Sequence, residues 1–270
     1  MTDWLAVSRE AKDAVARELA DLPTRVEREP FVGQGEGGDE TTAIDAAAEA
    51  AVVSVLERVH ESGVAFTLVS EELGERRFGE GDLRLVLDPI DGSMNAKRGV
   101  RFFAVSLAVA DGPTMGDVFF GYVFDFGAQE EWTARGGEGA FLDGRPVDGP
   151  GPKEAIEMLA FEATTTDLVA AQIPDMVGLA DRTRVMGSLA LSLCHLAAGR
   201  MDAVCSLKPA RSVDIAAAQL LVRERDIAID LPDSPPFDSA QLDLEPHSRV
   251  VAAATPALCA EVYARLSASR

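Results

Sequence analysis

The segment LRLVLDPIDGSMNAKRG, Leu83–Gly99, constrains the fold of this chain more than any other stretch. Leucines occupy alternate positions at its start and Val86 adds β-branched character, which predicts a strand that runs into the interior. Pro89 has no N–H to donate to a neighbouring strand, so we expect strand pairing to stop at Asp88. Gly92 then lets the chain turn.

Two carboxylates, Asp88 and Asp91, stand at the end of this predicted strand with two residues between them. In the interior they would repel each other and be costly to desolvate, and a divalent cation would offset both effects. Oxygen ligands at short spacing suit a hard cation such as Mg2+. The alternative is an acidic turn with both aspartates in water, because short motifs often occur by chance.

Two further acidic sites adjoin apolar segments. Glu71 and Glu72 follow the apolar run 64–69, and Asp214 stands at the start of an alanine-rich segment of helical character. Three acidic sites, each next to an apolar segment, indicate ligands that converge from separate elements of the fold.

These positions resemble the Mg2+-dependent, lithium-sensitive phosphatase family that includes inositol monophosphatase and fructose-1,6-bisphosphatase, and in particular its archaeal-type members. The family signature DPIDGTxNF stands here as DPIDGSMNA at 88–96, and the WDxAAG element stands as VDIAAA at 213–218. The resemblance covers nearly the whole chain. Its other matching segments are the Glu-Glu pair at 71–72, TAID at 42–45, TARGGEGAF at 133–141 and Gly-Ser at 187–188.

The resemblance implies a layered α-β-α-β-α sandwich of the α/β class, with an α+β N-terminal lobe. The apolar periodicity fits this, because strands and helices alternate after residue 156. We expect an N-terminal lobe at 1–150 with most metal ligands and a C-terminal lobe at 151–270 with Asp214 and substrate-site residues. Their boundary would be the Gly- and Pro-rich segment 144–152. Helices are predicted at 4–22, 46–59, 167–179, 188–198, 214–224 and 256–266, and strands at 83–88, 102–109, 118–126, 130–134, 156–161, 183–186, 202–206 and 249–254.

A metal centre with two or three Mg2+ ions is also implied by the resemblance. Glu71, Asp88 and the carbonyl of Ile90 would hold one ion, and Asp88, Asp91 and Asp214 a second. Family members often bind a third, looser ion through the residue that matches Glu71 and through water.

The resemblance assigns catalytic roles as well. Glu71 and Ser93 would orient the attacking water, and Asp45 would hold the hydroxyl of Ser93. The backbone amides of Gly92 and Ser93 would meet the phosphate. Serine keeps the hydroxyl of the family threonine but lacks the methyl that restricts its rotamer, and we expect activity to be retained.

The substrate is a small phosphorylated polyol or sugar by the same resemblance. Gly187, Ser188 and Leu189 match the segment that lines the polyol site. Lys208 and Arg211 could bind a second phosphate, as expected for archaeal-type members that act on inositol 1-phosphate and fructose 1,6-bisphosphate. The alternative is that these two cations only offset surface acidity. A 3'(2'),5'-bisphosphate nucleotidase and a non-catalytic regulatory protein on the same fold remain open.

The formal net charge of −20 argues against nucleic-acid and anionic-membrane partners.

Three scattered cysteines, Cys194, Cys205 and Cys259, are too few for a disulfide framework or a thiolate metal site. No apolar signal-peptide core and no charge-free window of membrane-spanning length is present, which predicts a cytoplasmic protein. Family members are commonly homodimers, and we expect the same here.

Two motifs suggest functions that we reject. Residues 33–38 match the dinucleotide fingerprint, but no convincing strand precedes them and Glu36 would stand where a pyrophosphate needs positive potential. We interpret this segment as a mobile surface loop. The triplet DFG at 125–127 lacks the upstream catalytic-loop signature of kinases and is expected to end a strand.

His195 lies in an apolar helical segment and is predicted to be a packed core residue.

The acidity of the chain generates a first prediction, which is adaptation to concentrated salt. If the acidic surface keeps the protein folded and dispersed in salt, its melting temperature should rise from low to multimolar KCl, because the cations screen the repulsion. Thermal melts at constant excess Mg2+ measure this. A melting temperature indifferent to KCl would instead indicate an ordinary acidic enzyme.

Overall fold

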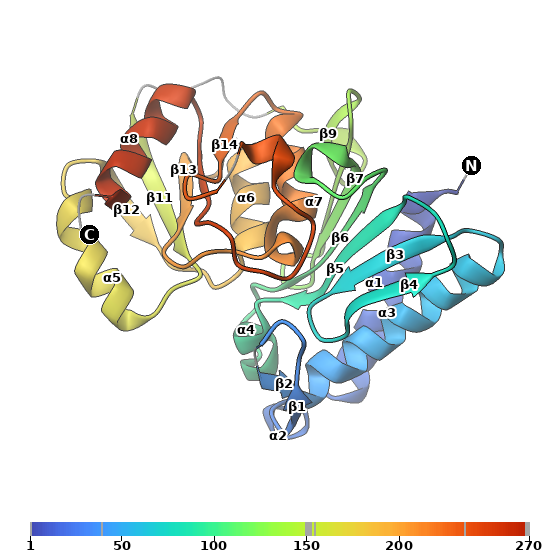
Figure 1. The fold of residues 1–270 in the computed structure, drawn as a ribbon. Coiled ribbons are helices and arrows are strands. Elements are labelled where there is room, and N and C mark those ends of the chain that lie inside the picture. The colour runs from blue at the N-terminus through green and yellow to red at the C-terminus, as the bar shows by residue number, and fades with distance from the viewer. Residues whose placement is uncertain (1, 39, 149–152, 154, 235, 268–270) are drawn as a thin grey trace.

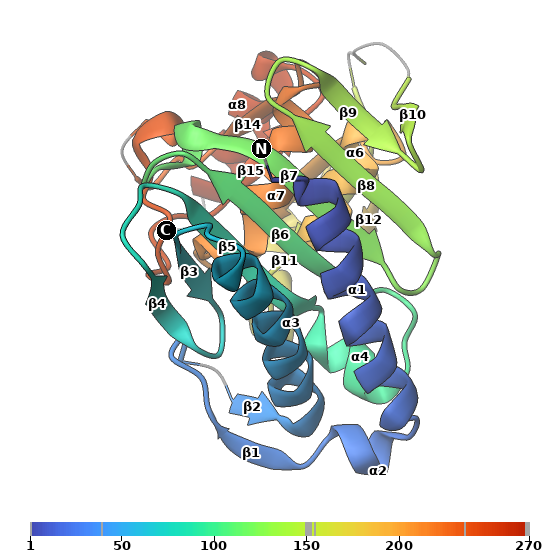
Figure 2. The ribbon, with the colours of Figure 1, turned by 90° about the vertical axis from the view of Figure 1, so that its right-hand side faces the viewer.

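Two large sheets alternate with layers of helices in the computed structural model, which describes residues 2–38, 40–148, 153, 155–234 and 236–267. Helices α1 and α3 cover one face of an eight-stranded sheet, and α6 and α7 lie between that sheet and a five-stranded one (Figures 1 and 2). Helices α5 and α8 lie on the outer side of the five-stranded sheet (Figure 1). The predicted α-β-α-β-α sandwich is therefore confirmed.

The helices include five of the six that the sequence predicts, with bounds that differ by at most three residues. They are α1 (Trp4–Asp21), α2 (Arg25–Arg28), α3 (Ala43–Glu61), α4 (Ser93–Arg98), α5 (Thr166–Gln172), α6 (Leu189–Ala197), α7 (Ser212–Arg223) and α8 (Pro256–Ser267), with 3-10 turns at Met115–Asp117, Ile173–Met176 and Phe237–Ser239. In α1, Trp4, Ala11, Val15 and Leu19 recur at helical spacing and are buried in one core with α3 and the sheet.

The eight-stranded sheet has the order β10-β9-β8-β7-β6-β5-β3-β4 and is antiparallel except for the pair β3 and β5. Its strands are β3 (Phe66–Ser70), β4 (Gly74–Phe78), β5 (Arg84–Asp91), β6 (Ala104–Ala110), β7 (Val118–Asp125), β8 (Glu130–Arg135), β9 (Gly139–Leu142) and β10 (Arg145–Pro146).

The five-stranded sheet has the order β12-β11-β13-β15-β14 and mixes parallel with antiparallel pairs. Its strands are β11 (Ile156–Glu162), β12 (Ala180–Arg184), β13 (Ala203–Ser206), β14 (Ala228–Asp230) and β15 (Val251–Ala253), and a separate hairpin pairs β1 (Phe31–Gln34) with β2 (Glu40–Thr42).

The sequence of β5 is apolar at successive positions because both faces of the strand are buried. Leu85 and Leu87 pack in the core shared with α1 and α3, whereas Val86 packs on the opposite face with α6 and α7. Side chains alternate along a strand, so Asp88 is placed on the same face as Val86. The first acidic residue of the DPIDGS segment therefore faces the helices of the central layer.

Three predictions of local structure were wrong. Strand β5 does not stop at Asp88 but continues to Asp91, because an irregular pairing with β6 accommodates Pro89 and the N–H of Ile90 donates instead to the Asp88 carboxylate at 2.9 Å. The segment 33–38 is not a plain surface loop, since Gly33 and Gln34 belong to β1. The helix expected at 167–179 changes to a 3-10 turn at Ile173, next to Pro174.

Other expectations concern the chain as a whole. The predicted lobe boundary at 144–152 is described only to residue 148, and 149–152 lie outside the described residues. Cys194, Cys205 and Cys259 are free and buried, as expected for core thiols. His195 is half-buried and packs between Phe102 and Trp132, in agreement with its prediction as a packed residue. Across the described residues, each helix is too short or too polar to cross a bilayer.

The contact between α7 and β7 generates a second prediction. A Cβ added to Gly121 would lie 2.5 Å from the backbone carbonyl oxygen of Ala217 in α7, which cannot move independently of the helix. Gly121→Ala should therefore destabilise the protein by about 1–3 kcal/mol in urea unfolding, because overpacking forces the helix away from the sheet. The matched control is Gly136→Ala, whose Cβ would meet its nearest neighbour at 3.7 Å. Equal stabilities of the two variants would contradict the close approach.

Candidate active site

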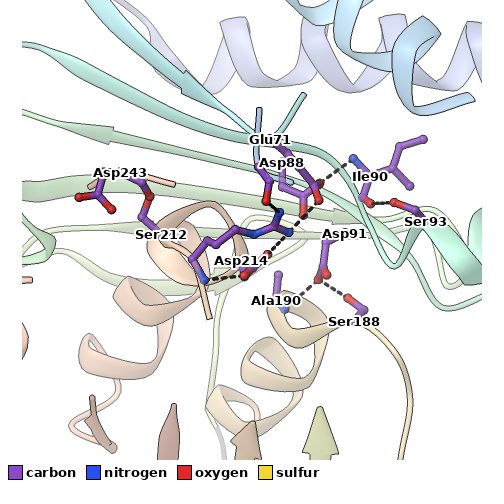
Figure 3. A network of polar contacts seen from close by, with 12 residues as sticks. Glu71, Asp88, Ile90, Asp91, Ser93, Ser188, Ala190, Ser212, Asp214 and Asp243 are labelled. Carbon is purple, nitrogen blue, oxygen red and sulfur yellow. Dashed lines mark hydrogen bonds and ion pairs between the residues drawn. The ribbon is translucent and has the colours of Figure 1, made fainter. Parts of the chain in front are cut away.

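The predicted metal ligands meet where strands and helices of the two halves come together. Strands β3 and β5 are parallel, and the register that pairs Ser70 with Leu87 brings the following residues, Glu71 and Asp88, to the same edge of the sheet. Helices α6 and α7 begin at this edge. Figure 3 shows Glu71, Asp88, Asp91 and Asp214 gathered between the strand ends and these helices.

Asp88 is the most enclosed of these carboxylates. Its side chain is buried, and burial together with the nearby Glu71, Asp91 and Asp214 raises its pKa well above the ordinary value. Like charges in a low-dielectric site favour the protonated form unless cations are close. Asp88 therefore marks the centre of the acidic cluster.

Glu71 and Asp214 flank the guanidinium of Arg211. Nη2 of Arg211 donates to Oε1 of Glu71 at 2.7 Å and to Oδ1 of Asp214 at 3.2 Å. Burial nevertheless raises the pKa of Glu71 to about 8, since Arg211 only partly counteracts burial and the repulsion of Asp214. The predicted role of Arg211 as a ligand for a second phosphate finds no support here, because its guanidinium is engaged inside the acidic cluster.

Asp91 is held by the N-terminus of α6. Its carboxylate accepts hydrogen bonds from the hydroxyl of Ser188 and from the N–H of Ala190 at 2.8 Å. A negative charge is favoured at this end of a helix, yet burial still raises the pKa of Asp91 to about 7. Ser188, predicted to line the polyol site, is buried and instead fixes a predicted metal ligand. Leu189 is also buried, whereas Gly187 is exposed at the entrance to α6.

The predicted pairing of Asp45 with Ser93 is wrong in this structure. Oδ2 of Asp45 accepts the N–H of Thr42 at 3.1 Å and its hydroxyl at 2.5 Å, because the two residues form the capping box at the start of α3. The hydroxyl of Ser93 donates to the carbonyl of Ile90 at 3.0 Å. Oδ1 of Asp45 is buried and has no hydrogen-bond partner among the described residues.

Gly92 has a left-handed backbone at φ 92° just before α4, as the turn after Asp91 requires. A Cβ at this position would approach the carbonyl oxygen of Gly187 to 3.0 Å. The side-chain amide of Asn95 also reaches this segment, since it donates to the carbonyl of Met186 at 2.8 Å. The DPIDGS turn and the entrance to α6 are thus packed directly together.

Two buried glutamates of the site were missed by the sequence analysis. Glu162 ends β11 and accepts hydrogen bonds from the N–H of Gly187 at 2.8 Å and the hydroxyl of Ser192 at 2.7 Å, so it positions the start of α6. Burial raises its pKa to about 7. Glu49 of α3 accepts the N–H groups of Glu72 and Leu73 and fixes the turn after β3. The rule applied to Asp88, an acidic residue at the end of a buried strand, would have found Glu162.

The β1–β2 hairpin also reaches the site, which the interpretation as a surface loop did not anticipate. The N–H of Glu36 donates to the carbonyl of Glu72 at 3.1 Å, and the N–H of Gly37 donates to that of Glu71 at 2.9 Å. The hydroxyl of Thr41 donates to the Glu72 carboxylate. By contrast Lys208 is exposed on the turn after β13, where its N–H donates to a backbone carbonyl.

The donor set fits a divalent cation in its chemistry. It consists of carboxylate and carbonyl oxygens, and the raised pKa values of Asp88 and Asp91 arise from burial and mutual repulsion that a cation would relieve. No three His, Cys, Asp or Glu side chains in the described part of the chain already form a metal-holding group. Two of the carboxylates, Glu71 and Asp214, are bridged by the guanidinium of Arg211.

These pKa shifts predict how the metal-free protein responds to pH. The native state keeps protons on Asp91 and Glu162 up to about pH 7, whereas the unfolded chain loses them at the ordinary lower pKa. Stability in EDTA should therefore fall as pH rises from 5.5 to 8. Urea unfolding at several pH values measures this free energy. Glu162→Gln should make the free energy of unfolding depend less steeply on pH, because it removes one titrating group. A stability that increases over this range would contradict the shifts.

Sequence and fold both match known proteins over nearly the whole chain. The family model for the inositol monophosphatase family matches residues 3–268. The chain is 32% identical over 256 residues to the fructose-1,6-bisphosphatase/inositol-1-monophosphatase of Archaeoglobus fulgidus, with 93% of each protein covered. It is 33% identical over 193 residues to the Nus factor SuhB of Pasteurella multocida, with 69% of each covered. A crystal structure of an inositol monophosphatase–fructose 1,6-bisphosphatase has the same fold, with a TM-score of 0.84, 23% identity, and 98% of this chain and 100% of that one covered. The chain therefore belongs to the inositol monophosphatase family.

Proposed function

We propose that this protein is a Mg2+-dependent phosphate monoester hydrolase that acts on inositol 1-phosphate, fructose 1,6-bisphosphate or both. The observation that carries the proposal is the convergence of Glu71, Asp88, Asp91 and Asp214 from three separate segments into one buried cluster. So much buried negative charge destabilises a fold unless it serves to bind cations. The relatives named as phosphatases for these two substrates support the same conclusion.

The chain offers ligands for two Mg2+ ions. Glu71, Asp88 and the Ile90 carbonyl would hold one, and Asp88, Asp91 and Asp214 the other; a third, looser ion would use Glu71. Bound Mg2+ would supply neutralisation of the phosphate oxygens, a lowered pKa for water and stabilisation of the leaving alkoxide.

The remaining steps belong to side chains and backbone of the protein itself. Glu71 and the hydroxyl of Ser93, which donates to the carbonyl of Ile90 in this structure, would orient the attacking water. The amides of Gly92 and Ser93 would bind the phosphate. The start of α6 keeps Asp91 in place through Ser188 and Ala190, so the site does not depend on a flexible loop for this ligand.

The choice between one and two phosphates depends on cations near the site. Arg211 is committed to Glu71 and Asp214. Lys208 is exposed and is therefore the side chain we propose for a second phosphate. A preference for fructose 1,6-bisphosphate would then depend on Lys208.

A second candidate function is regulatory. Relatives at 31% and 33% identity carry the name Nus factor SuhB, which is not the name of a metabolic enzyme. The net charge of −20 disfavours direct contact with nucleic acid, so such a role would act through protein contacts. A cytoplasmic location and a homodimeric state are further proposals that accompany either function.

Phosphate release in Mg2+ from inositol 1-phosphate, fructose 1,6-bisphosphate and adenosine 3',5'-bisphosphate tests the proposal. We expect turnover of one or both of the first two, and Asp88→Asn should lower it by at least about a thousandfold because it removes a shared ligand. The control is Asp181→Asn, which changes an exposed aspartate of β12. Circular dichroism would show that both variants fold.

Each outcome has a distinct meaning. Turnover confined to adenosine 3',5'-bisphosphate would replace the proposed substrate class with a nucleotidase. An active Asp88→Asn enzyme would contradict the assigned metal centre. Inactivity of the wild-type protein on all three substrates would favour the regulatory candidate.

A further inference from the structure

Arg211 is nearly enclosed by the groups that it contacts. Its side chain is 14% exposed, against 13% for Glu71 and 18% for Asp214, and the guanidinium bridges these two carboxylates. Its backbone N–H also donates to Oδ2 of Asp214 at 2.7 Å. The guanidinium therefore lies inside the acidic cluster and not on the outer surface of the protein.

The electrostatics of the cluster depend on this side chain. The guanidinium of Arg211 stays charged, because an arginine side chain keeps its proton at any pH at which proteins fold. A buried charge is tolerated when it is paired and hydrogen-bonded, and Arg211 provides this pairing for Glu71 and Asp214.

We propose that Arg211 is a resident counter-cation that stabilises the metal-free site and competes with divalent cations for Glu71 and Asp214. This inference rests on the proposed function, because the same two carboxylates are the proposed Mg2+ ligands. A guanidinium and a metal ion cannot share the same carboxylate lone pairs at bonding distance. The guanidinium occupies Oε1 of Glu71 and Oδ1 of Asp214 and repels a second cation at this place. Metal binding through those two oxygens therefore requires the guanidinium to withdraw, and the free energy of its ion pairs reduces the affinity for the metal.

The β1–β2 hairpin contacts the guanidinium that would withdraw. Nη1 of Arg211 donates to the carbonyl of Gly37 at 3.4 Å, and a Cβ at Gly37 would stand 2.6 Å from the same nitrogen. The hairpin is also bound to Glu71 through the N–H of Gly37. Displacement of the guanidinium therefore removes one of the contacts that hold the hairpin against the acidic cluster.

The test is metal binding to the stripped protein, independent of turnover. Mn2+ and Mg2+ titrations by calorimetry should show that Arg211→Gln binds the first ion at least about tenfold more tightly than wild type, because the competing cation is gone. Thermal melts in EDTA should show the opposite effect, with the variant melting at a lower temperature since Glu71, Asp88 and Asp214 lose their counter-charge. Both shifts are expected together.

Two further variants separate the proposal from its alternatives. Arg76→Gln removes an exposed positive charge paired with Glu57 and should leave the metal affinity within about twofold, which controls for the overall charge. Arg211→Lys keeps the charge without the forked donor and should give an intermediate affinity. If Arg211→Gln fails to fold in EDTA, the metal affinity of Arg211→Lys tests the proposal instead.

The outcomes that overturn the proposal are clear. An unchanged or weaker metal affinity of Arg211→Gln and Arg211→Lys would show that Arg211 supports the loaded site and does not compete with the ion. Turnover of a phosphate ester with that result would leave the proposed function intact. Tighter metal binding by a protein that hydrolyses none of the substrates would support the counter-cation and contradict the proposed function. A wild-type protein that binds neither Mn2+ nor Mg2+ would overturn both.

Discussion

Mutual repulsion among buried carboxylates is the constraint on which the rest of this structure depends. Asp88 and Asp91 come from one strand, and Glu71 and Asp214 come from the ends of two other segments. Their concentration at one edge of the sheet raises the pKa of each of the two strand aspartates. The fold has to hold these groups together against their repulsion, and it does so with helix N-termini, backbone amides and the guanidinium of Arg211.

The layered architecture supplies that restraint. Helices α6 and α7 lie between the two sheets and begin at the edge where β3 and β5 end (Figure 1). Their N-termini direct N–H groups and favourable dipoles at Asp91 and Asp214. Glu162 links this arrangement to the five-stranded sheet, because it binds Gly187 and Ser192 at the start of α6. Both sheets therefore contribute to the position of one cluster.

Much of the fold could be predicted from local patterns, because burial on one or both faces imposes a period on the sequence. The helical spacing of Ala11, Val15 and Leu19 predicted the first helix, and the apolar run before Asp88 predicted the central strand. Short or polar strands such as β4 and β14 were not predicted, since their residues pair at sheet edges and carry little apolar periodicity. Strand β5 continues past Pro89 because β6, the neighbouring strand, pairs with it irregularly there, and the local sequence does not show that partner.

The sequence by itself determined which carboxylates form the cluster, because their types and the apolar segments that precede them are written locally in the chain. Only the tertiary structure decided what each one contacts. Ser188 holds Asp91, which lies 97 residues earlier in the chain, and Arg211 binds Glu71, which lies 140 residues earlier. Such partners are chosen by the register of parallel strands and by the placement of helix ends, which are properties of packing between distant segments and leave no periodic signal in either one.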